Sequence, residues 1–147
     1  MKSLRFCLLT AAALLALASC DFMPVVVTVQ VIDEDGHDRL DPNSEYFIGG
    51  NIEAVYDGKV YPVEIIIPET KTYAVDFFGL RLRQSWGYDY YYLDFGEFDG
   101  ADNQHVTVTF KWPDGTSDTI RTTHIRFLGD TWRLNGKKAD PPIILVK

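Results

Sequence analysis

Hydrophobic side chains recur at every second position over several stretches of the chain. Between Val25 and Ile32 every odd-numbered residue is valine, and between His105 and Trp112 every even-numbered residue is valine, phenylalanine or tryptophan. Because successive side chains of a strand point to opposite faces, a period of two predicts strands with one buried face. Shorter strands are predicted at residues 72–78, 80–83, 118–123, 131–134 and 143–146.

Asp57-Gly58 is the clearest turn signal in the chain. It separates two largely apolar stretches, Asn51–Tyr56 and Lys59–Ile67, and Asp-Gly favours the two-residue type I′ turn of a β-hairpin. The pairs that such a turn sets are Tyr56 with Lys59, Ala54 with Tyr61 and Ile52 with Val63. Pro62 lacks an N–H group, so we expect it at a sheet edge or a bulge.

A second hairpin is predicted around residues 113–117, Pro-Asp-Gly-Thr-Ser. A two-residue turn at Asp114-Gly115 would direct Arg121 into the core, and burying an unpaired arginine is costly. A five-residue loop over 113–117 avoids that cost and is the prediction. The pairs it sets are Ile120 with Phe110 and Thr122 with Val108.

Together these signals predict an all-β domain over residues 25–147. The strands are short, turn signals recur every 8–12 residues or so, and no helical period follows residue 24. This pattern is typical of an antiparallel β-sandwich of immunoglobulin-like type, and a small β-barrel is the alternative. Asn135-Gly136 predicts another tight turn, and Glu97–Asn103 predicts a loop.

The first residues have a different pattern. Lys2 and Arg5 precede a run, Phe6–Ala18, that is apolar except for Thr10 and ends in small residues. This order is typical of a secretory signal peptide. A membrane-spanning helix is the competing interpretation, but the run would rise only about 20 Å, whereas a bilayer core is about 30 Å thick.

Leu17-Ala18-Ser19-Cys20 resembles the lipobox of bacterial lipoproteins. The resemblance implies cleavage before Cys20, a thioether-linked diacylglyceryl group on Cys20 and acylation of the new amino terminus by a fatty acid such as palmitate. Residues 1–19 would then be the signal peptide, and residues 20–24 a lipidated tether that several acyl chains hold stably in a membrane. The alternative is an ordinary secretory signal with a chance cysteine.

The same resemblance implies a location at the cell membrane or the outer membrane, facing the periplasm or the cell exterior. Asp21 fits two interpretations, because an acid after the lipidated cysteine resembles an inner-membrane retention signal in some bacteria and a cell-surface export signal in others. Gly96–Gly100 and Trp112–Thr116 are similar to segments of small β-rich lipoproteins from Bacteroides-like bacteria. No function is attached to that resemblance.

Charge and cysteine content narrow the possible partners. The net charge is −7, and losing Lys2 and Arg5 with the signal makes it −9, which argues against nucleic acid or anionic lipid as a partner. Cys7 would leave with the signal and Cys20 would carry lipid, so no disulfide is expected. The fold must therefore rest on its core, to which the 14% of aromatic residues contribute.

The densest aromatic stretch offers the best candidate for ligand binding. In a strand over Ser85–Phe95, one face carries Tyr91, Leu93 and Phe95, and we expect that face to be buried. The other face carries Trp86, Tyr88, Tyr90 and Tyr92. An exposed aromatic row suits a sugar ring or a protein partner. The alternative is that these rings pack across strands or beneath the loop that follows.

An acidic loop follows the first strand. Asp33, Asp35, Asp38 and Asp41 offer the oxygen ligands that calcium prefers. The established calcium-loop pattern is not met, because aligning on Gly36 places a valine at the first ligand position and no glutamate at the last. We therefore predict a solvated turn whose aspartates bond to local amides, with no metal and no cofactor.

Residues of catalytic type form no recognisable motif. The histidines and serines considered are His37, His105, His124, Ser44, Ser85 and Ser117. They lack short metal-ligand spacing and a nucleophile-elbow context, and Asp94 and Glu97 are interpreted as surface charge. The sequence favours a non-catalytic binding, adhesion or accessory module. The alternative is a small hydrolase or metal-dependent enzyme whose site assembles from distant residues.

Overall fold

A computed structural model of the 147-residue chain describes residues 24–66, 79–85, 90–98, 100, 102–126 and 128–147. Within these ranges the regular structure is ten strands and one short 3-10 turn, Gly49–Asn51. The strands are β1 Val25–Ile32, β2 Glu53–Tyr56, β3 Lys59–Ile66, β4 Leu80–Gln84, β5 Tyr91–Phe98, β6 Gln104–Lys111, β7 Ser117–Ile125, β8 Gly129–Leu134, β9 Lys137–Ala139 and β10 Ile143–Val146.

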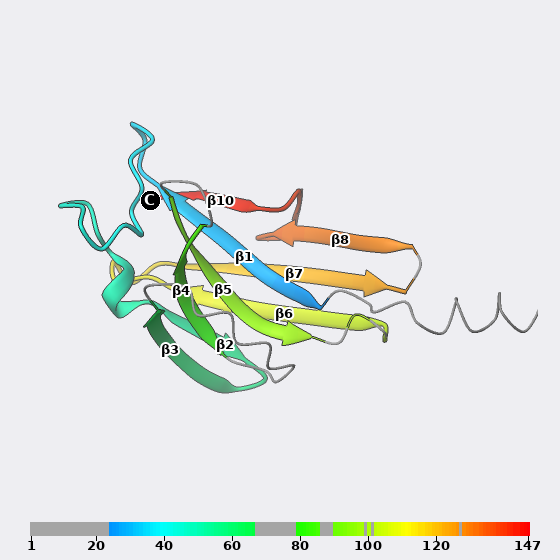
Figure 1. Cartoon of the computed structure of the whole chain (residues 1–147). Coiled ribbons are helices and arrows are strands. Elements are labelled where there is room, and N and C mark those ends of the chain that lie inside the picture. The colour runs from blue at the N-terminus through cyan, green and yellow to red at the C-terminus, as the bar shows by residue number, and fades with distance from the viewer. Residues whose placement is uncertain (1–23, 67–78, 86–89, 99, 101, 127) are drawn as a thin grey trace, which may run out of the picture.

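All ten strands belong to one sheet, in the order β10-β1-β5-β4-β3-β2-β6-β7-β8-β9. The sheet curls until it is nearly closed into a barrel, with β1, β4 and β5 in front of β6 and β7 in Figure 1. The predicted all-β class is confirmed, and the barrel alternative describes the architecture. The sheet is mixed rather than wholly antiparallel, because β1 pairs with β10 and β3 pairs with β4 in parallel.

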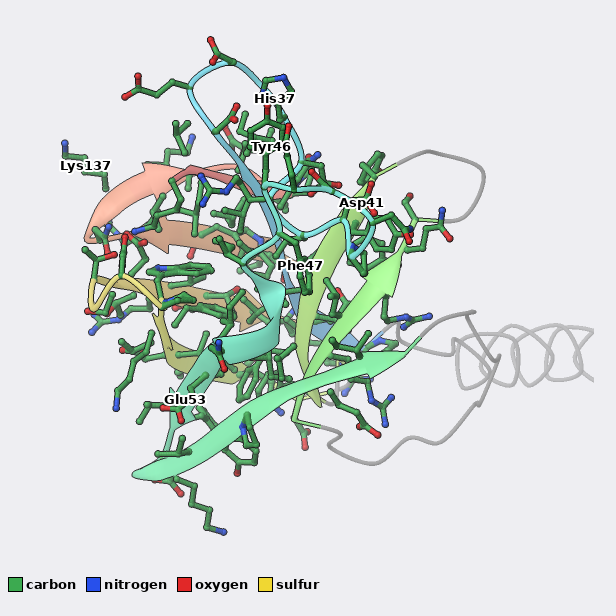
Figure 2. All side chains as sticks on the ribbon, turned by 90° about the vertical axis from the view of Figure 1, so that its left-hand side faces the viewer. His37, Asp41, Tyr46, Phe47, Glu53 and Lys137 are labelled. Atoms are coloured by element: carbon green, nitrogen blue, oxygen red, sulfur yellow. The ribbon has the colours of Figure 1, made fainter. Side chains whose placement is uncertain are left out.

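Strand β3 connects the two halves of the sheet. Its residues 59–62 pair with β2, and its residues 63–66 pair with β4. Pro62 is the last residue of the β2 pairing, so this proline lies where the strand changes partner, as suits a residue with no N–H to donate. The strands surround an interior filled by side chains, into which Phe47 points (Figure 2).

The interior follows the predicted alternation. The odd-numbered valines of β1 are 0–5% exposed, and Val106, Val108, Phe110 and Trp112 are 0–4% exposed. The rings of Tyr56, Tyr61, Phe95 and Phe98 meet edge to face or at a tilt, with centroids 5.5 to 6.4 Å apart, which is the favourable range for aromatic pairs. The core-face predictions for these strands are confirmed.

Both predicted two-residue turns are confirmed. Asp57 and Gly58 have φ values of 48° and 71°, and Asn135 and Gly136 have φ values of 49° and 83°. Positive φ at both central residues is the type I′ geometry that Asp-Gly and Asn-Gly favour. The first turn sets the expected pairs, Tyr56 with Lys59 and Ala54 with Tyr61, and the Val63 N–H donates to the Ile52 carbonyl over 3.0 Å.

The predicted pairing of β6 with β7 is wrong by two residues. The loop has five residues as expected, but β6 ends at Lys111 and β7 begins at Ser117, so the loop covers 112–116. Val108 therefore faces Ile120, and Phe110 faces Asp118. Since the shift is even, the inward and outward faces are unchanged.

Other boundaries also differ from the sequence analysis. The strand predicted over Ser85–Phe95 begins only at Tyr91, because the Ser85 N–H donates to the Tyr90 carbonyl over 2.9 Å and these two residues therefore lie opposite each other. Strand β5 continues to Phe98, where a loop was predicted, because one extra residue is accommodated between the Val27–Phe95 and Val25–Phe98 pairs. Gly96, with φ of 65°, lies at this bulge, where glycine has little steric cost. Strand β9 was not predicted, because a three-residue strand with two lysines has no hydrophobic period.

Several predictions concern residues outside the described ranges. They include the signal peptide, Cys20 with most of its tether, and the strand predicted at residues 72–78. Among the residues that the structure does describe, no helix is both long and apolar enough to cross a bilayer.

Candidate functional site

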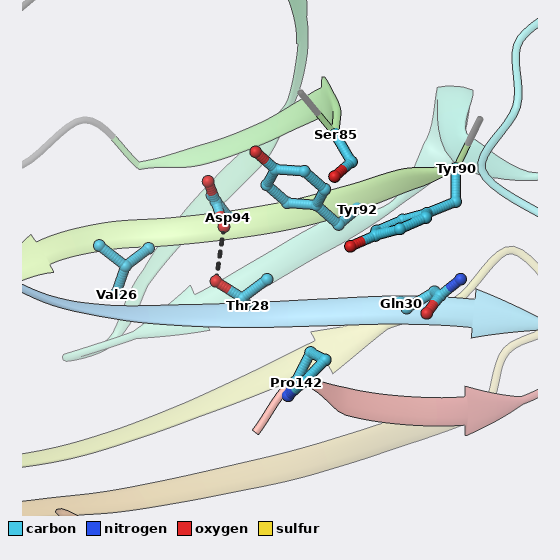
Figure 3. A pocket seen from close by; sticks show the side chains of 8 residues that line it. All are labelled: Val26, Thr28, Gln30, Ser85, Tyr90, Tyr92, Asp94 and Pro142. Atoms are coloured by element: carbon cyan, nitrogen blue, oxygen red, sulfur yellow. Dashed lines mark hydrogen bonds between the residues drawn. The ribbon is translucent and has the colours of Figure 1, made fainter. Parts of the chain in front are cut away.

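An open groove of about 400 Å³ lies on the outer face of the sheet, across β1 and β5. Its lining residues come from β1, from β5 and from the segments that follow β4 and precede β10 (Figure 3). They are Val26, Thr28, Gln30, Ser85, Tyr90, Tyr92, Asp94 and Pro142. The groove thus combines two phenol rings, two apolar side chains, two hydroxyls, an amide and a carboxylate.

Tyr90 and Tyr92 contribute the aromatic surface of the groove. Their ring centroids lie 6.5 Å apart with planes inclined at 56°, and both side chains are partly buried. The opposite face of the strand, with Tyr91, Leu93 and Phe95, is in the core, as predicted. Trp86 and Tyr88, the other candidate ligand-binding residues, lie outside the described residues.

Asp94 is the one charged residue in the described lining, and the sequence analysis assigned it wrongly to surface charge. It is only 6% exposed. The Thr28 hydroxyl donates to its Oδ1 over 2.7 Å, and an Arg83 guanidinium nitrogen lies 3.5 Å from its Oδ2. Asp94 is buried because it pairs with residues of β1 and β4 on either side of β5, and long side chains on those strands cover it.

The sequence contained a partial signal for this site. Tyr90, Tyr92 and Asp94 share one period-two face, so alternation alone places the carboxylate beside the two rings. Thr28 and Gln30 are also on the outward face of a predicted strand. Nothing local indicated that β1 would pair with β5, so the polar half of the groove was not predicted.

The acidic loop after β1 forms a second cluster, at one end of the molecule (Figure 2). Ligand atoms of Asp33, Asp35 and His37 lie within 4.8 Å of one another, a set that suits a transition-metal cation. Here Asp33 accepts bonds from the Asp35 N–H, the His37 N–H and the His37 ring. Burial opposes ionisation, but the bonds from His37 outweigh it and lower the pKa of Asp33.

The other two aspartates of that loop bond to backbone amides as well. Asp38 accepts from the Leu40 N–H and, through its other oxygen, from the Tyr91 N–H over 2.7 Å, which joins the loop to the start of β5. Burial, together with the nearby Asp41 charge, raises the pKa of Asp38. Asp41 accepts from the Asn43 N–H. The predicted bonds to local amides are confirmed for Asp33, Asp38 and Asp41. The solvated turn is wrong for Asp38, which is partly buried and also bonds to the start of β5.

The three histidines lie on different parts of the described structure. His37 stacks on Tyr46 in the acidic loop, with centroids 4.5 Å apart, and His105 contacts Thr123 at the start of β6. His124, near the end of β7, has Nδ1 2.5 Å from Asp130 Oδ1 and Nε2 2.9 Å from the Gly100 carbonyl. Both partners are acceptors, so both ring nitrogens donate, and the bond to Asp130 raises the pKa of His124.

A third polar cluster surrounds Asp118 inside the β6–β7 hairpin. Its carboxylate accepts from Trp112 Nε1 over 2.7 Å and from Asn135 Nδ2 over 2.6 Å, and the Lys147 ammonium lies 2.7 Å away. Burial opposes ionisation, but the bonds from Lys147, Asn135 and Trp112 outweigh it and lower the pKa of Asp118. This cluster links the β6–β7 loop, the Asn135-Gly136 turn and Lys147, which follows β10, through one carboxylate.

The fold and the groove define a class: a nearly closed β-barrel with a polar and aromatic groove on its outer surface. The chain matches no protein-family model, no curated protein and no solved structure.

Proposed function

We propose that the chain is a lipid-anchored, non-catalytic binding module of the bacterial cell envelope, and that the groove over β1 and β5 binds a glycan. The observation that carries the proposal is the composition of the groove. Tyr90 and Tyr92 lie beside Asp94, Thr28 and Gln30, so flat apolar surface and hydrogen-bonding groups converge on one volume. Sugar rings need both, because they have apolar C–H faces and hydroxyl edges.

A non-catalytic role is supported by the residues that line the groove. No histidine or cysteine is among its described lining residues, and Asp94 is bonded to Thr28. The raised pKa of His124 and its bond to Asp130 occur elsewhere, between the end of β7 and β8. A titratable pair outside the groove does not supply a general base to a ligand inside it, because proton transfer requires hydrogen-bond contact.

The proposed anchor would hold the groove near a membrane. Cys20, in the lipobox-like Leu17–Cys20, precedes the first residue of β1 by only five positions. Five extended residues span at most about 18 Å, so the barrel would stay close to the lipid surface. Val26 is both the second residue of β1 and part of the groove. The groove runs from this end of β1 to Gln30, beside Tyr92.

The binding proposal is tested by affinity electrophoresis in a panel of neutral polysaccharides. Tyr90→Ala and Tyr92→Ala should each weaken retention about tenfold, because losing an aromatic contact at a binding hot spot costs about 1–2 kcal/mol. Tyr46→Ala is the matched control, since Tyr46 is a 39% exposed tyrosine on the acidic loop, away from the groove. Retention that neither groove variant changes would contradict the proposed site.

The anchor is tested separately in a bacterial host with labelled palmitate. The full chain should incorporate the label and fractionate with membranes, whereas Cys20→Ser should remain unlabelled and be released. Cys7→Ser, which alters the other cysteine of the chain, is the control and should be labelled normally. An unlabelled wild-type chain would contradict lipid attachment but leave glycan binding open.

A further inference from the structure

We infer that the groove selects neutral, hydroxyl-rich sugars against acidic ones, and that Asp94 determines this selectivity. The inference rests on the proposed function and specifies its ligand class. The juxtaposition that carries it is a buried carboxylate in line with the Tyr90 and Tyr92 rings, across from the hydrogen-bonding side chains of Thr28 and Gln30 on β1 (Figure 3).

Asp94 makes the groove rich in hydrogen-bond acceptors. An ionised carboxylate accepts hydrogen bonds and donates none. The Thr28 hydroxyl donates its proton to Asp94 Oδ1 over 2.7 Å, so the oxygen of Thr28 also faces the groove as an acceptor. A ligand must therefore bring donors to this part of the groove, and sugar hydroxyls meet that requirement.

The cation beside Asp94 does not reverse this preference. Arg83 lies 3.5 Å from Asp94 Oδ2, yet Arg83 is not among the described residues that line the groove. A ligand in the groove thus contacts the carboxylate and not the guanidinium, although the Arg83 side chain is 25% exposed and that of Asp94 only 8%. The side chain of Asp94 is 8% exposed, and charges act more strongly where little water screens them.

The remaining lining residues suit the uncharged part of a sugar. Val26 and Pro142 offer apolar surface on one side, and the rings of Tyr90 and Tyr92 offer it on the other (Figure 3). Gln30 and Ser85 add groups that can both donate and accept. The chain as a whole carries a net charge of −7, which further disfavours an anionic polymer.

The test compares each neutral polysaccharide of the panel with its own carboxymethylated derivative, so that only charge differs. Wild-type protein should bind at least one neutral member and bind its carboxymethylated form at least about tenfold more weakly, because like charges in contact are strongly unfavourable. Asp94→Asn keeps the side-chain shape and an acceptor oxygen for Thr28. It should reduce the difference between the two forms to about twofold or less.

The outcomes separate this inference from the proposed function. Equal or tighter wild-type binding to the carboxymethylated forms would overturn the selectivity while leaving glycan binding intact, and so would an Asp94→Asn variant with undiminished selectivity. Retention by no member of the panel would overturn both. Should Asp94→Asn fail to fold, as its melting curve would reveal, Asp94→Ala, which also removes the charge, takes its place in the same comparison, and undiminished selectivity there would overturn the assignment to Asp94.

Discussion

Asp94 and Asp118 are both aspartates in strands, and they are buried to nearly the same degree, 6% and 8% exposed. Their surroundings differ. Asp118 accepts bonds from an indole, an amide and an ammonium within 2.7 Å inside a hairpin. Asp94 accepts a bond from the Thr28 hydroxyl, lies 3.5 Å from the Arg83 guanidinium and lines the groove.

This difference shows that burial alone does not distinguish a structural carboxylate from one available to a ligand. What distinguishes the two carboxylates is whether the strand face that carries them points into the core or outward. Asp118 lies on the inward face of β7, where its partners come from neighbouring turns, whereas Asp94 lies on the outward face of β5.

A third buried polar residue, Thr122, is 0% exposed, and its hydroxyl has no hydrogen-bond partner among the described residues.

The same substitution at the two aspartates should have unequal costs. Asp118→Ala leaves the Lys147 ammonium, the buried Trp112 indole N–H and the Asn135 amide without their acceptor, so we expect the free energy of unfolding to fall by about 3 kcal/mol. Asp94→Ala should cost about 1 kcal/mol, because Thr28 and the partly exposed Arg83 can turn to water. Urea denaturation of both variants measures the difference, and equal costs would remove the distinction drawn here.

Acid should reveal the structural role of Asp118 without removing its volume. The folded-state pKa lies below the ordinary value of 3.8, so its contribution is complete above the unfolded pKa and is lost as pH falls through the folded pKa. The stability gap between wild type and Asp118→Asn should therefore be widest near neutral pH and narrow below about pH 4. Other lowered carboxyls, Asp33 and Asp114, cancel because both proteins share them. A gap that stays constant with pH would contradict this account.

A substitution at Thr122 should raise the stability of the protein rather than lower it. Replacing its unpartnered hydroxyl with a methyl group of similar size, as in Thr122→Val, should raise the free energy of unfolding by about 1 kcal/mol. Thr119→Val on the same strand is the matched control, because the Thr119 hydroxyl bonds to that of Thr109 over 3.1 Å. That variant should show no gain. Stabilisation of both variants alike would indicate β-propensity rather than relief of an unpaired hydroxyl.

His124 should produce the smallest effect, at the opposite end of the pH range. Its folded pKa is raised above 6.5, so its contribution is present below that value and is lost as pH rises through the folded pKa. The difference in melting temperature between wild type and His124→Gln should shrink between pH 6 and pH 9. In an Asp130→Asn background, which removes the charged partner, the pH dependence should largely disappear. A pH dependence that persisted in the Asp130→Asn background would have to come from other titratable groups.

The local part of the fold could be predicted from the sequence. Asp57-Gly58 and Asn135-Gly136 fix their own turn geometry, and alternation then assigns faces to β1 and β6, because both signals depend on neighbouring residues alone. The β6–β7 register failed by two because Pro-Asp-Gly-Thr-Ser specifies a loop length but not which residue closes it. Trp112 lies inside the loop, with its N–H bonded to the Thr116 carbonyl.

Only the aromatic half of the candidate site could be predicted from the sequence. Tyr90 and Tyr92 followed from alternation within one segment, but the partners of Asp94 come from β1 and β4, and no local pattern specifies which strands become neighbours. The parallel pairings of β1 with β10 and β3 with β4 were unpredicted for the same reason, since each joins segments without a short turn between them. Asp94 is buried only because β1 and β4 pair with β5, which the sequence did not indicate.

The parallel pairing of β1 with β10 has a consequence for how the chain folds. Val29 pairs with Ile143 and Val31 with Leu145, so the first described strand acquires its outer neighbour only after residues 143–146 have been synthesised. Contacts between such distant segments slow folding, because a long loop must close before they form. A growing chain would meanwhile expose one unpaired edge of a valine-rich strand until β10 becomes available.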